Sequence, residues 1–191
     1  MEVGRRRFLN WSWAGIGCVG LSLWGCAARN QTPTQGEAPQ TLKLSSSAFD
    51  PDGLIPAKYT CDGENRSPAL SWDAPPAATR SLVLLVSDPD APGKTFIHWV
   101  LYDLPPETRQ LPEGIKADPI LVQGGVQGKS DFGKYGYGGP CPPQGTHRYV
   151  FTLYALDTVL DLPPGAKQAD VLKAIEGHIL AQAELIGRYG R

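Results

Sequence analysis

The sequence predicts a mainly β domain that carries an α-helix near its C-terminus. Short apolar runs are separated by Pro- and Gly-rich turns without helical periodicity, which is typical of an antiparallel β fold. From His147 onward, every second residue belongs to one apolar face, as in a half-buried strand. After Ala169 the apolar residues recur at spacings of three and four, which indicates a helix.

The chain is long enough for one ordinary globular domain with a short appendage. It has 191 residues, of which 41% are hydrophobic and 19% are charged, and its formal net charge is -1. Because the charge is nearly balanced, we expect no broad basic face and therefore no nucleic-acid partner.

Residues 1–25 have the composition of an export signal. The run Arg5-Arg6-Arg7 precedes an uncharged apolar stretch that extends to Gly25, which is the order of the two regions of a signal peptide. Residues 5–9 are similar to the twin-arginine export pattern. Leu23-Trp24-Gly25-Cys26 is similar to a lipobox, in which the cysteine is lipidated and becomes the new N-terminus. We therefore predict a twin-arginine-type lipoprotein signal peptide, and an uncleaved signal anchor is the alternative.

Residues 26–40 are expected to form a lipid-anchored tether. Cys26 is the predicted lipid acceptor, and the residues from Ala28 onward are rich in Asn, Gln, Thr, Pro and Gly. A segment of this composition buries too little apolar surface to fold. We therefore expect an exported protein that is anchored to a membrane and faces the periplasm or the cell exterior, with its folded domain over residues 41–191.

The expected strands begin with residues 42–46, whose side chains alternate between apolar and polar. A short strand over residues 69–72 follows, and Pro75-Pro76 end it. The unbroken apolar run 82–86 and the segment 98–102 form the next two strands. Their order along the chain, with only turns between them, favours an antiparallel body.

The loop between residues 86 and 98 carries candidate site residues. Pro89 and Pro92 stiffen it, since proline fixes φ and has no N–H group. Asp88 and Asp90 are therefore held near one end of the sheet, a short distance along the chain from His98. The two aspartates also have a purely structural interpretation, in which their carboxylates cap the turn.

Two elements complete the predicted domain. In the strand that starts at His147, one face carries His147, Tyr149, Phe151, Leu153 and Ala155, so the first two point the same way. Beyond Pro163-Pro164-Gly165, a helix is predicted from Ala169, and Gly187 is expected to end it. Its apolar stripe consists of Leu172, Ile175, Ile179, Ala183 and Ile186 and is expected to cover one side of the sheets.

The cysteines bear on the compartment. Cys18 lies in the apolar signal region and Cys26 is the expected lipid acceptor, which leaves Cys61 and Cys141 in the domain. Two cysteines in an exported domain suggest a disulfide bond. The alternative is a pair of buried free thiols.

Three separated motifs resemble those of the phosphatidylethanolamine-binding proteins. They are Asp88-Pro89-Asp90-Ala91-Pro92 with His98-Trp99, then Gly138-Gly139-Pro140-Cys141-Pro142-Pro143, then His147-Arg148-Tyr149. The sequence is most similar to the bacterial branch described as Raf-kinase-inhibitor-like, over roughly residues 42–191. The resemblance implies a Greek-key β-sandwich of two antiparallel sheets with a C-terminal α-helix.

In these relatives the motifs line one small pocket for phosphate-like and other anionic groups. The ligand-binding residues that the resemblance implies are Asp88, Asp90, His98, Cys141, Pro142, His147 and Tyr149. Both histidines would donate hydrogen bonds to the anion, and Asp88 would orient one of them. Tyr149 would close the pocket, Asp90 and Pro142 would shape it, and Cys141 would alter its rim. Periodicity alone does not bring the two histidines together, and Tyr149 also fits a place in the core.

The resemblance implies a binding or regulatory module rather than an enzyme. The expected ligand is a phosphate or a phospholipid head group, without a cofactor or metal ion, and a partner enzyme that the protein inhibits is a further option. One alternative is a hydrolase with zinc bound by His98, His147 and a carboxylate, but no HExxH spacing supports it. The other is a hydrolase with Cys141 as nucleophile and His147 as base, which a disulfide would prevent.

Overall fold

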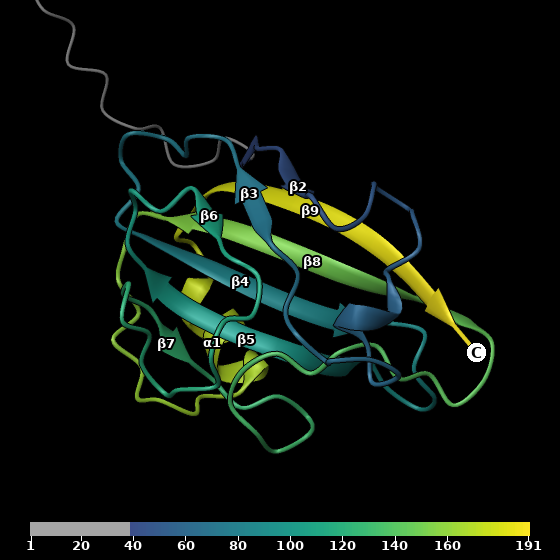
Figure 1. Cartoon of the computed structure of the whole chain (residues 1–191). Coiled ribbons are helices and arrows are strands. Elements are labelled where there is room, and N and C mark those ends of the chain that lie inside the picture. Colours follow the sequence, from purple (N-terminus) through teal and green to yellow (C-terminus); the bar gives the residue numbers. More distant parts are fainter. Residues whose placement is uncertain (1–38) are drawn as a thin grey trace, which may run out of the picture. The chain divides into compact units, whose positions relative to one another are not determined.

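Residues 39–191 are described by a computed structural model, and they form two β-sheets and one short α-helix (Figure 1). The large sheet has the strand order β1-β9-β8-β4-β5-β7, with bounds Gln40–Thr41, Ile179–Gly190, Thr146–Leu156, Ser81–Asp88, Phe96–Leu104 and Val126–Gln127. The small sheet has the order β2-β3-β6, with bounds Leu44–Ser46, Leu70–Trp72 and Gln110–Leu111. Helix α1 covers Gln168–Ile175. The mainly β fold class is therefore confirmed.

The strand order brings three strand ends together. All paired strands are antiparallel except the edge strand β1, which runs parallel to β9. Strand β4 lies between β5 and β8, with Asp88 opposite Phe96 and Ser87 opposite Val150. The end of β4 therefore lies beside the beginnings of β5 and β8, and the candidate site is at this end of the sheet.

The unbroken apolar run in β4 reflects burial on both faces of the large sheet. Leu82, Leu84 and Val86 belong to a core cluster that also includes residues of the small sheet, and Val83 and Leu85 belong to a cluster on the helix side. A strand covered on only one side would alternate between apolar and polar residues. The central place of β4 thus explains why its sequence does not alternate between apolar and polar residues.

The predicted alternation in β8 is confirmed. His147, Tyr149, Phe151, Leu153 and Ala155 are all buried, while the residues between them are partly or fully exposed. The first expected strand, over residues 42–46, is confirmed from Leu44 to Ser46. Residues 40–41 lie before that expected strand and form a separate strand that pairs with β9.

The predicted C-terminal helix is correct in its first half and wrong in its second. Helix α1 ends at Ile175, Gly177 adopts a left-handed backbone with φ of 79°, and the chain continues as strand β9. The helical spacing of the apolar residues competes here with an alternation in which Ala181, Ala183 and Leu185 are buried. Pairing with β8 along almost its whole length decides in favour of the strand.

Gly187 is therefore not the end of a helix. A Cβ atom at this position would lie 2.6 Å from Cγ1 of Ile55 and 2.8 Å from Cε2 of Phe49. The missing side chain lets Ile55 and Phe49, which are both buried, pack directly against β9.

The predicted signal peptide, the predicted lipidation site Cys26 and nearly all of the predicted tether lie outside the described residues. Within residues 39–191, no helix is long and apolar enough to cross a membrane.

Candidate functional site

His98 and His147 line the same pocket, at the end of the large sheet where β4 stops and β5 and β8 begin. The pocket has a volume of about 320 Å³, which is enough for a small anion with an attached group. Its lining consists of Asp88, Ala91, Pro92, Phe96, His98, Phe132, Cys141, Pro142, Pro143 and His147. Of the ligand-binding residues that the family resemblance implies, only Asp90 and Tyr149 are not part of this pocket lining.

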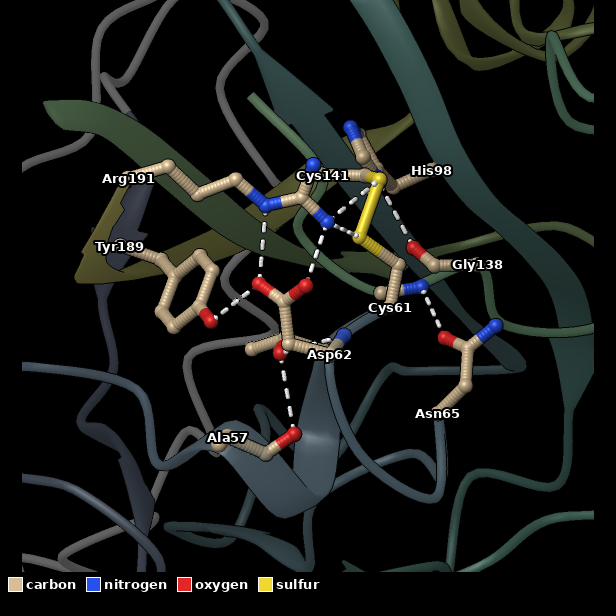
Figure 2. The surroundings of a disulfide bond; sticks show 11 residues. Ala57, Cys61, Asp62, Asn65, His98, Gly138, Cys141, Tyr189 and Arg191 are labelled. Carbon is tan, nitrogen blue, oxygen red and sulfur yellow. Dashed lines mark hydrogen bonds and ion pairs between the residues drawn. A yellow bond between two sulfur atoms is a disulfide. The ribbon is translucent and has the colours of Figure 1, made fainter. Parts of the chain in front are cut away.

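His98 is held by the glycine-rich segment. Its Nδ1 atom lies 2.6 Å from the carbonyl oxygen of Gly138 (Figure 2), and the Gly138 N–H donates in turn to the His98 carbonyl oxygen. Because a carbonyl can only accept, Nδ1 carries the proton and Nε2 remains available to the pocket. Burial lowers the pKa of His98, and the Gly138 carbonyl and the Asp88 carboxylate only partly oppose this effect. His98 is therefore neutral near pH 7, and its Nε2 accepts a hydrogen bond in this state.

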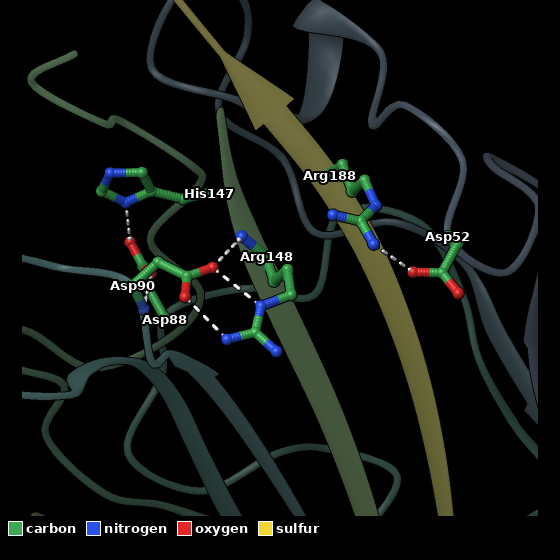
Figure 3. Close-up of polar contacts among 6 residues, drawn as sticks. All are labelled: Asp52, Asp88, Asp90, His147, Arg148 and Arg188. Carbon is green, nitrogen blue, oxygen red and sulfur yellow. Dashed lines mark hydrogen bonds and ion pairs between the residues drawn. The ribbon is translucent and has the colours of Figure 1, made fainter. Parts of the chain in front are cut away.

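His147 is oriented by Asp88. The Nδ1 atom of His147 lies 2.7 Å from an Asp88 carboxylate oxygen (Figure 3), and both side chains are buried. The other carboxylate oxygen of Asp88 accepts from the Asp90 N–H at 2.8 Å. Asp88 therefore fixes the loop and the imidazole together, and it leaves Nε2 of His147 as the nitrogen available to the pocket.

Asp90 points away from the pocket and anchors the loop to β8. Its carboxylate accepts hydrogen bonds from Nε and Nη2 of Arg148 at 2.9 and 2.7 Å, and from the Arg148 N–H at 2.9 Å (Figure 3). These contacts hold the pKa of Asp90 far below its usual range. Asp90 thus shapes the loop from outside, through a partner that sequence reasoning did not single out.

Tyr149 lies behind His98 rather than in the pocket wall. The two rings meet edge to face with centroids 5.2 Å apart, and Tyr149 is almost fully buried. Its hydroxyl has no hydrogen-bond partner among the described residues. Burial raises the pKa of Tyr149, and the nearby Asp88 carboxylate adds to the effect. Tyr149 is therefore a neutral phenol that packs against the imidazole of His98.

Two phenylalanines that the sequence reasoning missed form an apolar side of the pocket. The rings of Phe96 and Phe132 meet edge to face with centroids 4.8 Å apart, and each also contacts the ring of His98. Phe132 is 43% exposed and so reaches the rim. Phe96 shares a face with His98 on β5 and could have been inferred from alternation, whereas Phe132 lies on a loop without such a signal.

Cys61 and Cys141 are joined by a disulfide bond, with their Cα atoms 5.4 Å apart (Figure 2). The bond ties the segment after Gly138 to the segment before Asn65, and Cys141 contributes to the pocket wall. In this state Cys141 offers no thiolate for nucleophilic attack. Within residues 39–191, no group of three or more His, Cys, Asp or Glu side chains is arranged to hold a metal ion.

The chain forms a two-sheet β domain with a pocket at one end of the large sheet, and comparison with known proteins gives its family. The phosphatidylethanolamine-binding protein family profile matches residues 45–190, so the chain belongs to this family.

Its relatives include UPF0098 proteins of archaea. The protein of Methanothermobacter thermautotrophicus is 55% identical over 150 residues, which cover 78% of this chain and 99% of that protein. The protein of Pyrococcus horikoshii is 43% identical over 184 residues, with 93% of this chain and 83% of that protein covered.

Solved structures of the family have the same fold. CT736 of Chlamydia trachomatis, described as a putative phosphatidylethanolamine-binding protein homolog, has a TM-score of 0.73 and 41% identity, with 80% of this chain and 99% of that chain covered. YbcL of E. coli, described as a new member of the mammalian phosphatidylethanolamine-binding protein family, has a TM-score of 0.73 and 31% identity, with 78% of this chain and 98% of that chain covered.

Proposed function

We propose that the protein binds a small anionic group, such as a phosphate or a phospholipid head group, in the pocket between His98 and His147. The observation that carries this proposal is that two separated histidines line one pocket with their Nδ1 atoms already bonded, which leaves both Nε2 atoms for a ligand. The apolar side formed by Phe96 and Phe132 suits the carbon chain of an ester.

The pocket distinguishes between protonation states of its ligand. While His98 is neutral, its Nε2 is an acceptor, and Asp88 adds a buried negative charge nearby. An anion that contacts Nε2 of His98 therefore binds in one of two ways: it brings its own proton, as a monoprotonated phosphate does, or its arrival protonates the His98 imidazole.

Calorimetric titration with inorganic phosphate tests the proposal. His98→Ala and His147→Ala each remove one Nε2 atom and are expected to weaken binding about tenfold or more, as for loss of a hydrogen bond to a charged group. His178→Ala is the matched control, because His178 also contacts an aspartate, Asp157, at 2.8 Å but is about half exposed and outside the pocket. Equal affinity in the wild type and in both pocket variants would remove the site.

We further propose that the domain is exported and anchored to a membrane through a lipid on Cys26. The supporting features are the Arg5-Arg6-Arg7 run, the apolar stretch and the lipobox-like residues before Cys26. Cys26→Ser is expected to move the protein from the membrane fraction to the soluble fraction. Mass spectrometry that finds an intact Met1 without acyl groups on the membrane-bound protein would contradict the lipid anchor.

A protein partner is the last part of the proposal. The exposed ring of Phe132 lies beside the anion pocket, so a partner that inserts an acidic or phosphorylated side chain would contact both features. A pull-down from the native envelope with the tether intact is expected to recover a partner with the wild type and to lose it with His147→Ala. A partner recovered equally by both would bind elsewhere.

A further inference from the structure

The disulfide bond has an arginine fixed against both of its sulfur atoms. The Nη2 atom of Arg191 lies 2.8 Å from Sγ of Cys61 and 3.5 Å from Sγ of Cys141 (Figure 2). Asp62 holds the guanidinium in place by accepting from its Nε and Nη2 atoms at 2.9 and 2.5 Å, and Tyr189 donates to Asp62 at 2.6 Å. A cation is thus positioned where negative charge would develop if the bond opened.

The two cysteine residues differ in exposure. Cys141 is exposed and lines both the pocket of His98 and His147 and a second cavity of about 260 Å³, whereas Cys61 lines only the second cavity. Cys61 is less exposed and is closer to the guanidinium. An incoming thiol can therefore reach Cys141, while Cys61 occupies the better site for a leaving thiolate.

We propose that Cys61–Cys141 is a site of thiol–disulfide exchange with a dithiol reductant. A thiolate of the dithiol attacks Sγ of Cys141, the bond to Cys61 breaks, and its electron pair stays on Cys61 beside Arg191. The second thiol of the dithiol then attacks the mixed disulfide and releases Cys141. The dithiol becomes a disulfide and loses two electrons, and its two protons end on the two cysteines of the protein.

Opening the disulfide bond also affects the pocket between His98 and His147. The Gly138–Cys141 segment is held by the disulfide, by the Cys61 N–H that donates to the Pro140 carbonyl, and by the Gly139 N–H that donates to Asn65. The same segment supplies the carbonyl that orients His98. Reduction therefore removes the covalent restraint on the orientation of His98 and weakens anion binding. This second part rests on the proposed function, whereas the exchange itself does not.

The exchange is tested by the rate at which dithiothreitol reduces the folded protein, followed by the appearance of free thiols. Arg191→Gln is expected to slow reduction about threefold to tenfold, because the departing thiolate loses its cation. Asp62→Asn removes the opposing carboxylate and is expected to speed it. Arg188→Gln is the matched control, because Arg188 lies on the same strand but contacts Asp52 instead.

The opposite expected changes in rate distinguish an effect of charge from an effect of a loosened structure. A looser structure would speed reduction in both Arg191→Gln and Asp62→Asn. Equal rates, or faster reduction in Arg191→Gln, would overturn the exchange site. In a second arm, inorganic phosphate is titrated into oxidised and reduced wild-type protein, and the reduced form is expected to bind at least about threefold more weakly. Equal affinities would overturn the link to the pocket. Absence of phosphate binding in both forms, with the predicted rates, would refute the proposed function alone.

Discussion

Proton uptake is the prediction that follows most directly from the pocket geometry. Burial keeps His98 neutral, and Asp88 is the buried negative charge beside it. A ligand that remains a dianion from acidic to neutral pH, such as sulfate, brings no proton of its own. If sulfate accepts a hydrogen bond from Nε2 of His98, that imidazole must therefore take up a proton, and affinity must rise as the pH falls.

The magnitudes show that proton uptake is favourable. A proton on an imidazole about 4 Å from one negative charge gains about 4 kcal/mol at the effective dielectric constant typical of protein sites. Holding that proton one pH unit above the group's pKa costs about 1.4 kcal/mol. Attraction therefore exceeds the cost over a span of pH, and within it the dissociation constant for sulfate is expected to rise about tenfold per pH unit.

The assay is calorimetry with sulfate at several pH values between about 5.5 and 7.5, a range centred near the ordinary histidine pKa. Repeating each titration in buffers of different ionisation enthalpy measures the number of protons taken up. A dissociation constant that does not change with pH, together with no proton uptake, would refute the reasoning. His98→Ala should reduce the pH dependence, while His178→Ala should leave it unchanged because His178 is outside the pocket.

Three further predictions concern stability. Gly187→Ala is expected to lower the free energy of unfolding by about 1–3 kcal/mol, since its Cβ would overlap Ile55, and urea titration measures this. Replacing both Cys61 and Cys141 by serine is expected to cost about 4 kcal/mol, because the bond closes a long loop with a sequence separation of 80; unchanged urea midpoints would argue against the bond. Asp90→Asn is expected to flatten the loss of stability below about pH 4 in acid titrations, because a carboxylate with a depressed pKa stabilises the fold above its unfolded-state pKa and loses that contribution as the pH falls.

Much of the large sheet could be predicted because its signals are local. The alternation from His147 to Ala155 identifies a strand with one buried face, and the unbroken run from Leu82 to Val86 identifies a strand covered on both faces. Pro89 and Pro92 end the first of two paired strands, so the position of Asp88 at the end of a strand was also predictable.

The residues after Ile175 show where local signals fail. Ala181, Ala183 and Leu185 occur among residues that favour helices, and helical spacing and strand alternation are both present. The strand forms because β8 offers it a partner and a buried face, and this partner lies elsewhere in the chain. Intrinsic secondary-structure propensity does not include the stabilisation that comes from pairing with β8, because this pairing is a tertiary contact.

The candidate site combines both kinds of information. The sequence by itself determined the residue types that the pocket uses, because His98, His147 and Asp88 stand in recognisable motifs beside strand ends. Only the tertiary structure decided that the two imidazoles share one wall, that Asp90 turns outward to Arg148, and that Arg191 lies against the disulfide. The physical reason is that strand order and loop packing place these groups, and both depend on contacts between residues far apart in the chain.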